Sequence, residues 1–238
     1  HNVAARDMYA AFYSKLESNG FKFDPDWVKT KKKSSKKMRG YINERLHTQS
    51  DARSLSIGAG TGVVEEDILN DGIAIDLQEC QSSSLNYLRS KNIAFKSYIG
   101  TDLSVITDAQ YDLIFVFTIS YCLSYSEYQS FFHQIHRMLK TGGRCILFDC
   151  NVIHGRGCMA SHFLCHPFRF TRFNKNEVFW GWFRHPTLHQ ALAEDAGLTQ
   201  IDHFIEDKQT WHVFEKQEMD KWSTLNSSGA EALHGHCP

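Results

Sequence analysis

Three closely spaced glycines are the first residues in this chain whose spacing suggests chemistry. The stretch SLSIGAGTGVVEEDIL, Ser54 to Leu69, places Gly58, Gly60 and Gly62 between an apolar run and an apparent helix. Glycines in such a turn let the chain bend tightly and let a ligand approach the backbone closely. A dinucleotide fingerprint would require glycine at position 63, where this chain has valine. The loop therefore favours a nucleotide site other than a dinucleotide site, the alternative being a strand–helix turn without a ligand.

Two acids follow later strand candidates and can complete a nucleotide site. Asp76 ends the segment GIAIDL, and Asp102 follows the next apolar segment in Gly100-Thr101-Asp102-Leu103. The carboxyl ends of parallel strands share one edge of a sheet, where open α/β sheets bind ligands. A carboxylate at that edge can accept hydrogen bonds from ribose hydroxyls, which predicts this role for Asp76. A second one suits the exocyclic amine of adenine, which predicts that role for Asp102.

Two further residues are candidates for the reacting side of such a site. His154 comes just beyond the strand candidate RCILFDC, and histidine titrates in the range that a general base needs. Tyr121 comes just after the strand candidate YDLIFVF and can contact substrate or cofactor. An ordinary loop histidine and a packing tyrosine are the structural alternatives.

Several other groups of polar and aromatic residues have less specific patterns. The densest positive charge, Lys29 to Arg39, suits an anionic substrate, although a solvated helix face explains it better. Cys158, His162, Cys165 and His166 are metal-ligand types without the paired spacing of structural zinc sites, so we predict no metal. The aromatic stretch at 151–183, with Arg169, Arg172, Trp180 and Trp182 followed by Arg184, is expected to form a wall of the substrate pocket.

The elements that must position these residues alternate between strands and helices. The strand candidates are 54–58, 72–77, 93–99, 111–117 and 144–150, and helices are expected at 62–69, 80–90 and 126–140. The last helix has a capping box at Ser124 and Glu127 and is expected to end at Gly142-Gly143. A helix at 186–196 and two strands joined by a turn follow. This order predicts an α/β fold: a doubly wound, seven-stranded, mostly parallel sheet with a terminal antiparallel hairpin.

Three regions are expected along the chain. Residues 1–50 contain two predicted helices, the second capped by Asp24 with Pro25 at its first position, and should form an N-terminal lid or flank. Tyr9 and Tyr13 on the first helix are placed to close over a ligand, core packing being the alternative. Residues 51–216 should form the main domain, with 151–183 as a substrate-side insertion. Residues 217–238 read as a polar tail.

Composition limits the function classes. The chain has 238 residues, with 26 Lys and Arg against 27 Asp and Glu, so it lacks the basic excess of a general nucleic-acid binder. Its seven cysteines are scattered, which favours reduced thiols and a cytoplasmic location. No apolar stretch approaches the about 20 residues that span a bilayer, so no membrane partner is expected. Because the chain also lacks a basic excess, no nucleic-acid partner is expected.

The order of these segments resembles that of the class I, Rossmann-like S-adenosylmethionine-dependent methyltransferases. The resemblance covers roughly residues 50–215, and YDLIF followed by HRMLKTGGRCILFD is its most specific part. It implies S-adenosylmethionine as cofactor and S-adenosylhomocysteine as product. The expected cofactor-binding residues are those that the resemblance implies, with Tyr13 of the first helix added. They are Gly58, Ala59, Gly60, Gly62, Asp76, Leu77, Asp102, Leu103, Phe117, Thr118, Tyr13 and Arg39.

One position departs from that family. Ser56 stands two residues before Gly58, where such loops commonly carry an acid. The departure predicts that backbone carbonyls or water hold the cofactor's amino group.

Motifs that the sequence lacks exclude several classes of methyl acceptor. The segment FTISYC is unlike the Asn/Asp-Pro-Pro-aromatic motif of enzymes that methylate nucleic-acid bases. Magnesium-binding acids and the paired glutamates of protein-arginine enzymes are also missing there. We therefore expect methyl transfer to an oxygen or nitrogen of a small molecule, such as a sugar, an amine or a natural-product intermediate, that is anionic or contains a ring. The alternatives are a non-catalytic cofactor-binding scaffold and an NAD(P)-dependent oxidoreductase.

Overall fold

The computed structural model describes residues 3–150, 184–206 and 209–218. These residues form one sheet whose strands lie in the order β3-β2-β1-β4-β5-β7-β6. The pairs β2–β3, β1–β2, β1–β4 and β4–β5 are parallel, and β7 pairs antiparallel with β5 and β6. The predicted fold class is therefore confirmed. The strands are β1 (Ser54–Ile57), β2 (Ile75–Glu79), β3 (Ser97–Ile99), β4 (Tyr111–Phe117), β5 (Leu139–Cys150), β6 (Leu198–Glu206) and β7 (Gln209–Lys216).

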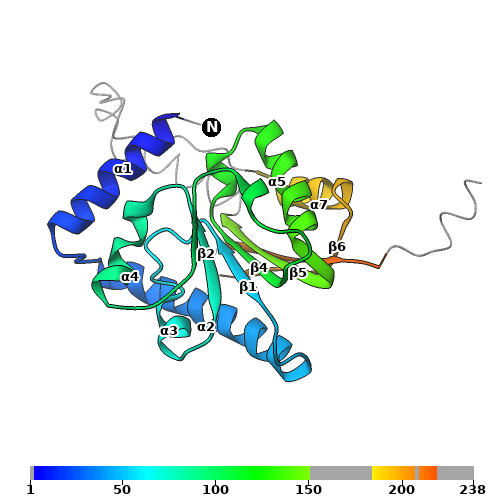
Figure 1. Cartoon of the computed structure of the whole chain (residues 1–238). Coiled ribbons are helices and arrows are strands. Elements are labelled where there is room, and N and C mark those ends of the chain that lie inside the picture. The colour runs from blue at the N-terminus through cyan, green and yellow to red at the C-terminus, as the bar shows by residue number, and fades with distance from the viewer. Residues whose placement is uncertain (1–2, 151–183, 207–208, 219–238) are drawn as a thin grey trace, which may run out of the picture.

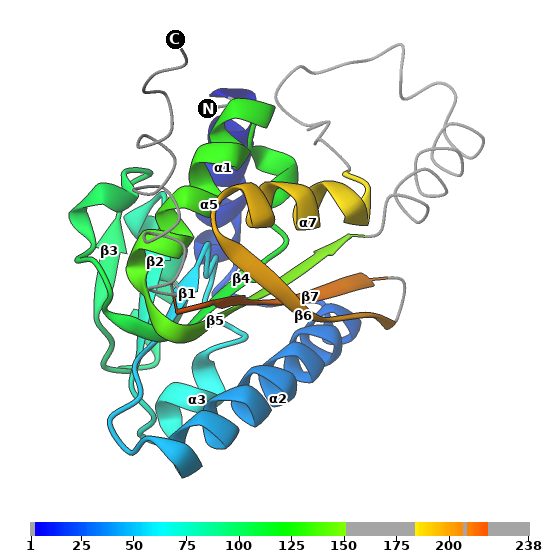
Figure 2. The same cartoon turned by 90° about the vertical axis from the view of Figure 1, so that its right-hand side faces the viewer.

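Helices cover both faces of this sheet. Figure 2 shows α5 and α7 on one side and α2 and α3 on the other. The described α-helices are α1 (Val3–Ser18), α2 (Pro25–Thr48), α3 (Glu66–Asn70), α4 (Asn86–Ser90), α5 (Tyr125–Met138) and α7 (Pro186–Asp195). Short 3-10 helices are η1 (Ser82–Leu85), η2 (Leu103–Val105) and η3 (Ser120–Cys122). None of the helices in the described ranges is long and apolar enough to cross a membrane.

The two N-terminal helices lie in different places (Figure 1). The N-cap Asp24 accepts a hydrogen bond from the backbone N–H of Trp27 at 2.9 Å and Pro25 opens α2, as the sequence predicts. Met38 and Ile42 of α2 are buried in the core on one face of the sheet. Helix α1 instead lies beside η1, where its side chains reach the carboxyl ends of the strands. Of the two N-terminal helices, α1 therefore lies at the carboxyl ends of the strands, whereas the buried side chains of α2 pack on a face of the sheet.

Several element boundaries differ from the expected ones. Strand β2 runs over Ile75–Glu79 rather than 72–77, and the expected helices at 62–69 and 80–90 are short. The predicted capping box of α5 is present, but α5 ends at Met138 and β5 begins at Leu139. Gly142 and Gly143 lie inside β5 rather than at the helix end. Gly142 has φ +70°, and the register of β5 against β4 shifts beside Tyr111, so the glycines serve a bulged strand.

Candidate functional site

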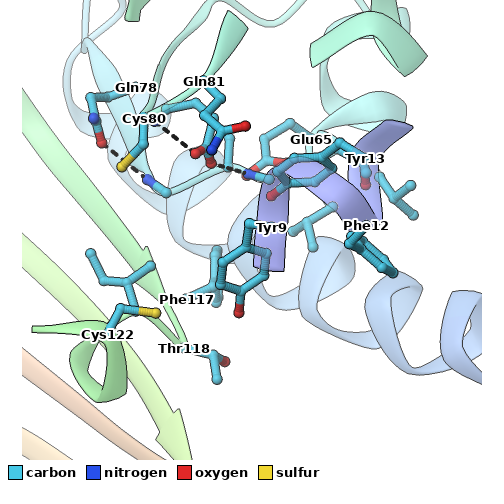
Figure 3. Close-up of a pocket in the computed structure, with 18 of the residues that line it drawn as sticks. Tyr9, Phe12, Tyr13, Glu65, Gln78, Cys80, Gln81, Phe117, Thr118 and Cys122 are labelled. Atoms are coloured by element: carbon cyan, nitrogen blue, oxygen red, sulfur yellow. Dashed lines mark hydrogen bonds between the residues drawn. The ribbon is translucent and has the colours of Figure 1, made fainter. Parts of the chain in front are cut away.

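A cavity of about 340 Å³ lies at the carboxyl ends of β1, β2 and β4, roofed in part by α1 (Figure 3). This is the edge at which parallel α/β sheets bind ligands. The residues that line the cavity are Tyr9, Phe12, Tyr13, Trp27, Lys31, Gly58, Ala59, Gly60, Thr61, Val63, Val64, Glu65, Gln78, Glu79, Cys80, Gln81, Phe117, Thr118, Ile119, Cys122 and Leu123. Six of the predicted cofactor residues are among them: Gly58, Ala59, Gly60, Phe117, Thr118 and Tyr13.

The glycine loop forms one wall of the cavity and requires glycine at two positions. Gly58 has φ +69°, and a Cβ there would approach Ile119 to 2.3 Å. Gly60 has φ +62°, and its backbone N–H points to the neighbouring strand. L-residues rarely adopt these angles, so glycine lets the backbone itself line the cavity.

Glu79, the last residue of β2, is the acid that the sequence reasoning missed. Its Oε2 accepts a hydrogen bond from the Gly60 N–H at 2.8 Å, and its Oε1 accepts one from the Cys80 N–H at 2.7 Å. Burial raises the pKa of this carboxyl, while those N–H groups lower it. Glu79 therefore holds a carboxylate against the glycine loop, where Asp76 was expected.

Asp76 lies near the opposite end of β2, outside the cavity. It pairs with Leu55 of β1, two residues before the end of that strand, and its carboxylate faces the Tyr111 hydroxyl at 2.7 Å. Arg53 at 3.1 Å and Lys96 at 3.4 Å complete its ion pairs. The prediction assumed that the strand ends at Leu77; because β2 continues to Glu79, the acid at its carboxyl end is Glu79.

Five other predicted cofactor residues also lie outside the cavity. Leu77 and Leu103 are buried in the two hydrophobic cores. Gly62, at φ +77°, lets the loop pack against Leu88. Asp102 is exposed, its carboxylate caps η2 by accepting from the Ser104 N–H at 2.8 Å, and it lines a second cavity that shares Leu123 with the main one.

Arg39 points from α2 towards α3, away from the cavity. Its guanidinium donates to the backbone carbonyl of Asp67 at 2.9 Å and pairs with Asp71. Lys31, earlier on the same helix, lines the cavity instead. The sequence shows where α2 begins but not how the helix is turned about its axis. It therefore did not show which lysine or arginine faces the site.

Ser56 and Glu65 form a buried pair behind the glycine loop. The Ser56 hydroxyl donates to Glu65 Oε1 at 2.6 Å, and both residues have 1% or less of their surface exposed. Burial raises the pKa of Glu65 to about 7, against the opposing effect of the Ser56 hydrogen bond. Sequence reasoning noted Ser56 but not its partner, because the two are nine positions apart and meet only when the loop folds back.

Aromatic side chains supply the wall opposite the loop. Tyr9 and Tyr13 of α1 stack with ring centroids 6.0 Å apart, and the Tyr13 ring is nearly buried. Burial and the nearby charge of Glu79 both raise the pKa of Tyr13, so its hydroxyl stays protonated. Trp27 lies below Lys31, whose ammonium is 5.5 Å from the ring centroid.

The turn after β4 is held in a constrained conformation. Thr118 has φ +56°, uncommon for a β-branched residue, and its N–H donates to the Phe148 carbonyl at 2.7 Å. Arg184 donates to the backbone carbonyls of Ser120 and of Leu123, the latter at 2.6 Å, and Asp149 accepts from the Ser120 hydroxyl. These contacts fix η3 at the mouth of the cavity.

Some predicted residues lie outside the described part of the chain. His154, the side chain of Tyr121, the candidate ligands Cys158 to His166, and the aromatic and basic residues of 151–183 are among them. Among the described residues, no group of three His, Cys, Asp or Glu side chains is arranged to hold a metal ion.

Comparison with known proteins agrees with this arrangement. Residues 55–147 match the family model described as "Methyltransferase domain". No curated protein matches the chain in a sequence search.

Solved structures share the fold at low sequence identity. An S-adenosylmethionine-dependent methyltransferase from Methanosarcina mazei has a TM-score of 0.59 and 13% identity, over 73% of this chain and 97% of that one. Magnesium protoporphyrin IX methyltransferase from Synechocystis, with bound S-adenosylhomocysteine, has a TM-score of 0.60 and 10% identity, over 87% and 99%. A putative sarcosine dimethylglycine methyltransferase from Galdieria sulphuraria has a TM-score of 0.51 and 15% identity, over 76% and 86%.

The matched region runs from β1 through the glycine loop and Glu79 to the middle of β5, and so contains most of the cavity wall. Residues 55–147 therefore carry a methyltransferase domain. The strand order and the terminal hairpin form the Rossmann-like fold that the S-adenosylmethionine-dependent methyltransferase from Methanosarcina mazei shares.

Proposed function

We propose that this methyltransferase transfers the methyl group to an oxygen or nitrogen atom of a small-molecule acceptor. The supporting observation is the cavity itself. At about 340 Å³ it is within the size range of small-molecule sites, and five aromatic side chains, those of Tyr9, Phe12, Tyr13, Trp27 and Phe117, line it. A ring-containing acceptor suits such walls. Two of the structural neighbours carry small-molecule names, magnesium protoporphyrin IX and sarcosine dimethylglycine.

The residues present fit the cofactor. Gly58 and Gly60 line the cavity with backbone at positive φ, which suits close approach of the methionine part. Glu79 is proposed as the ribose ligand in place of Asp76, because its carboxylate ends β2 and lines the cavity. Phe117, Thr118 and Ile119 would face the sulfonium. Asp102 stays a prediction for the adenine, since its cavity adjoins the main one at Leu123.

The chemistry asks little of the protein beyond position. S-adenosylmethionine supplies an electrophilic methyl group on a sulfonium. The constrained turn at Thr118 and the roof of α1 would hold an acceptor lone pair in line with that carbon and exclude water. A base is needed only where the acceptor must lose a proton, and His154 and Tyr121 stay the candidates for the acceptor side.

Two measurements test this proposal. Calorimetry should show that the full chain binds S-adenosylhomocysteine. Mass spectrometry with deuterated-methyl donor should then show label in small amines, hydroxylated aromatics or sugar acids and none in RNA or protein. Label in a macromolecule alone would contradict the small-molecule proposal. Tight cofactor binding without transfer to any acceptor of a broad panel would favour the non-catalytic alternative.

A further inference from the structure

Glu65 is a buried carboxylate with half of its hydrogen-bonding capacity unused. Its Oε1 accepts from Ser56, whereas Oε2 has no hydrogen-bond partner within the described residues. Only 1% of the residue's surface is exposed, so water offers that oxygen little compensation. An unpaired buried carboxylate oxygen is costly, and such a group calls for an explanation. Because Glu65 also lines the main cavity, that explanation can be a ligand.

The charged groups around Glu65 leave the site open to a cation. Burial has the largest effect and raises the pKa of Glu65; the Ser56 hydrogen bond and, more weakly, Lys31 of α2 lower it, and Glu79 of β2 raises it. No ion pair joins Glu65 to a lysine, arginine or histidine in the part of the chain that the structure describes. Glu79, by contrast, already uses both oxygens for backbone N–H groups. Of the two cavity acids, Glu65 is the one with a carboxylate oxygen, Oε2, that lacks a donor.

We propose that Glu65 receives the α-ammonium group of the methionine part of S-adenosylmethionine, with Ser56 as the residue that positions its carboxylate. The backbone supports this place: the Glu65 N–H donates to the Gly62 carbonyl at 3.1 Å, so Glu65 closes the same loop that approaches the cofactor. Ser56 stands where an acid was expected, and its hydroxyl brings an acid from nine residues later to that point. This inference rests on the cofactor of the proposed function, and it replaces the expectation that carbonyls or water hold the amino group.

The decisive experiment compares two ligands and three proteins by calorimetry. The ligands are S-adenosylhomocysteine and its analogue with a hydroxyl in place of the amino group. The proteins are the wild type, Glu65→Gln and the matched control Glu66→Gln; Glu66 bonds the Tyr87 hydroxyl at 2.9 Å and Lys32 at 3.5 Å, and does not line the main cavity.

Glu65→Gln should weaken S-adenosylhomocysteine binding about 10- to 100-fold, the range for a hydrogen bond to a charged group. It should change binding of the hydroxyl analogue less than about threefold, because that ligand has no ammonium to lose. Glu66→Gln should match the wild type with both ligands. Equal losses on both ligands, or no loss on either, would overturn the role of Glu65. If the wild type bound neither ligand, both the role of Glu65 and the proposed function would be contradicted.

A second measurement needs no variant. Carbon-13 spectra of glutamate-labelled wild type should show the Glu65 carboxyl titrating near pH 7 without ligand and at a lower pH when S-adenosylhomocysteine is bound. An ammonium partner stabilises the carboxylate and so lowers its pKa. A Glu65 carboxyl that keeps its titration midpoint in the complex would overturn the proposal.

Discussion

Acidic side chains at the two edges of the parallel sheet have different kinds of partner. At the edge where the strands begin, Asp76 has Arg53 and Lys96 as partners, and the buried Asp112 has Lys140 at 2.7 Å. At the edge where the strands end, Glu65 and Glu79 are bonded to a hydroxyl and to backbone N–H groups, and burial raises the pKa of both. The acids paired with cations stabilise the fold at the first edge, whereas we propose that the two acids buried without an ion pair at the second edge serve the ligand.

The largest expected effect concerns Glu79. Glu79→Ala should weaken S-adenosylhomocysteine binding about 1000-fold, because it would remove both the proposed charge-assisted hydrogen bonds to the ribose and the support of Gly60. The matched control on the same strand, Asp76→Ala, should bind within twofold of the wild type. Calorimetry measures both. If Asp76→Ala lost more affinity than Glu79→Ala, the contrast between the two edges would be reversed.

Glu65 should make the free energy of unfolding depend on pH. Its folded pKa of about 7 lies above the ordinary 4.5, so the folded state binds more protons between these values and stability falls as pH rises through them. The wild type should therefore lose about 3 kcal/mol relative to Glu65→Gln between pH 4.5 and 7.5 without ligand. Urea unfolding at four pH values tests this; parallel profiles would show that Glu65 does not titrate in this window.

Asp112 should matter to stability and not to the cofactor. It accepts from the Arg53 N–H at 2.9 Å and from Lys140, and it is almost fully buried. Asp112→Ala should lower the free energy of unfolding by about 2 kcal/mol, because the backbone donor loses its partner, while Lys140 is free to turn to water. S-adenosylhomocysteine affinity at low temperature should stay within twofold. A selective loss of affinity would place function at this edge as well.

The smallest effect is expected at Asp76. Its partners Arg53 and Lys96 have side chains 45% and 54% exposed, so solvent screens both ion pairs. Asp76→Asn should cost about 1 kcal/mol or less in urea unfolding and keep the Tyr111 hydroxyl bonded. A cost equal to that of Asp112→Ala would mean that this network is more deeply desolvated than its cations suggest.

The sequence predicted those parts of the fold and site that depend on local chemistry. Strand–helix alternation, the N-cap Asp24, the capping box of α5 and the glycine turn each depend on neighbouring residues, and each was found in the structure. The exact end of β2 is not written there, since IAIDLQE alternates without a break. The strand ends two residues later than expected. The acid at its carboxyl end is therefore Glu79, and Asp76 lies near the opposite edge of the sheet.

Residues that meet only through tertiary structure were beyond local patterns. Arg39 and Lys31 lie on one helix, and which of them faces the cavity depends on how α2 packs on the sheet. Glu65 reaches Ser56 only because the glycine loop reverses the chain. Asp102 shows the same limit, since a capping role for η2 and a ligand role require the same residue type at the same strand end.

The contacts of Ser120 connect two chain segments that lie far apart in the sequence. Asp149, near the end of β5, and Arg184, just before α7, both bond Ser120 of η3. The glycine loop is held by other residues, since the Gly60 N–H donates to Glu79 and the Gly58 N–H donates to Gln78. The two sides of the cavity mouth therefore have separate supports, so a substitution at Ser120 can displace η3 while the glycine loop keeps its contacts.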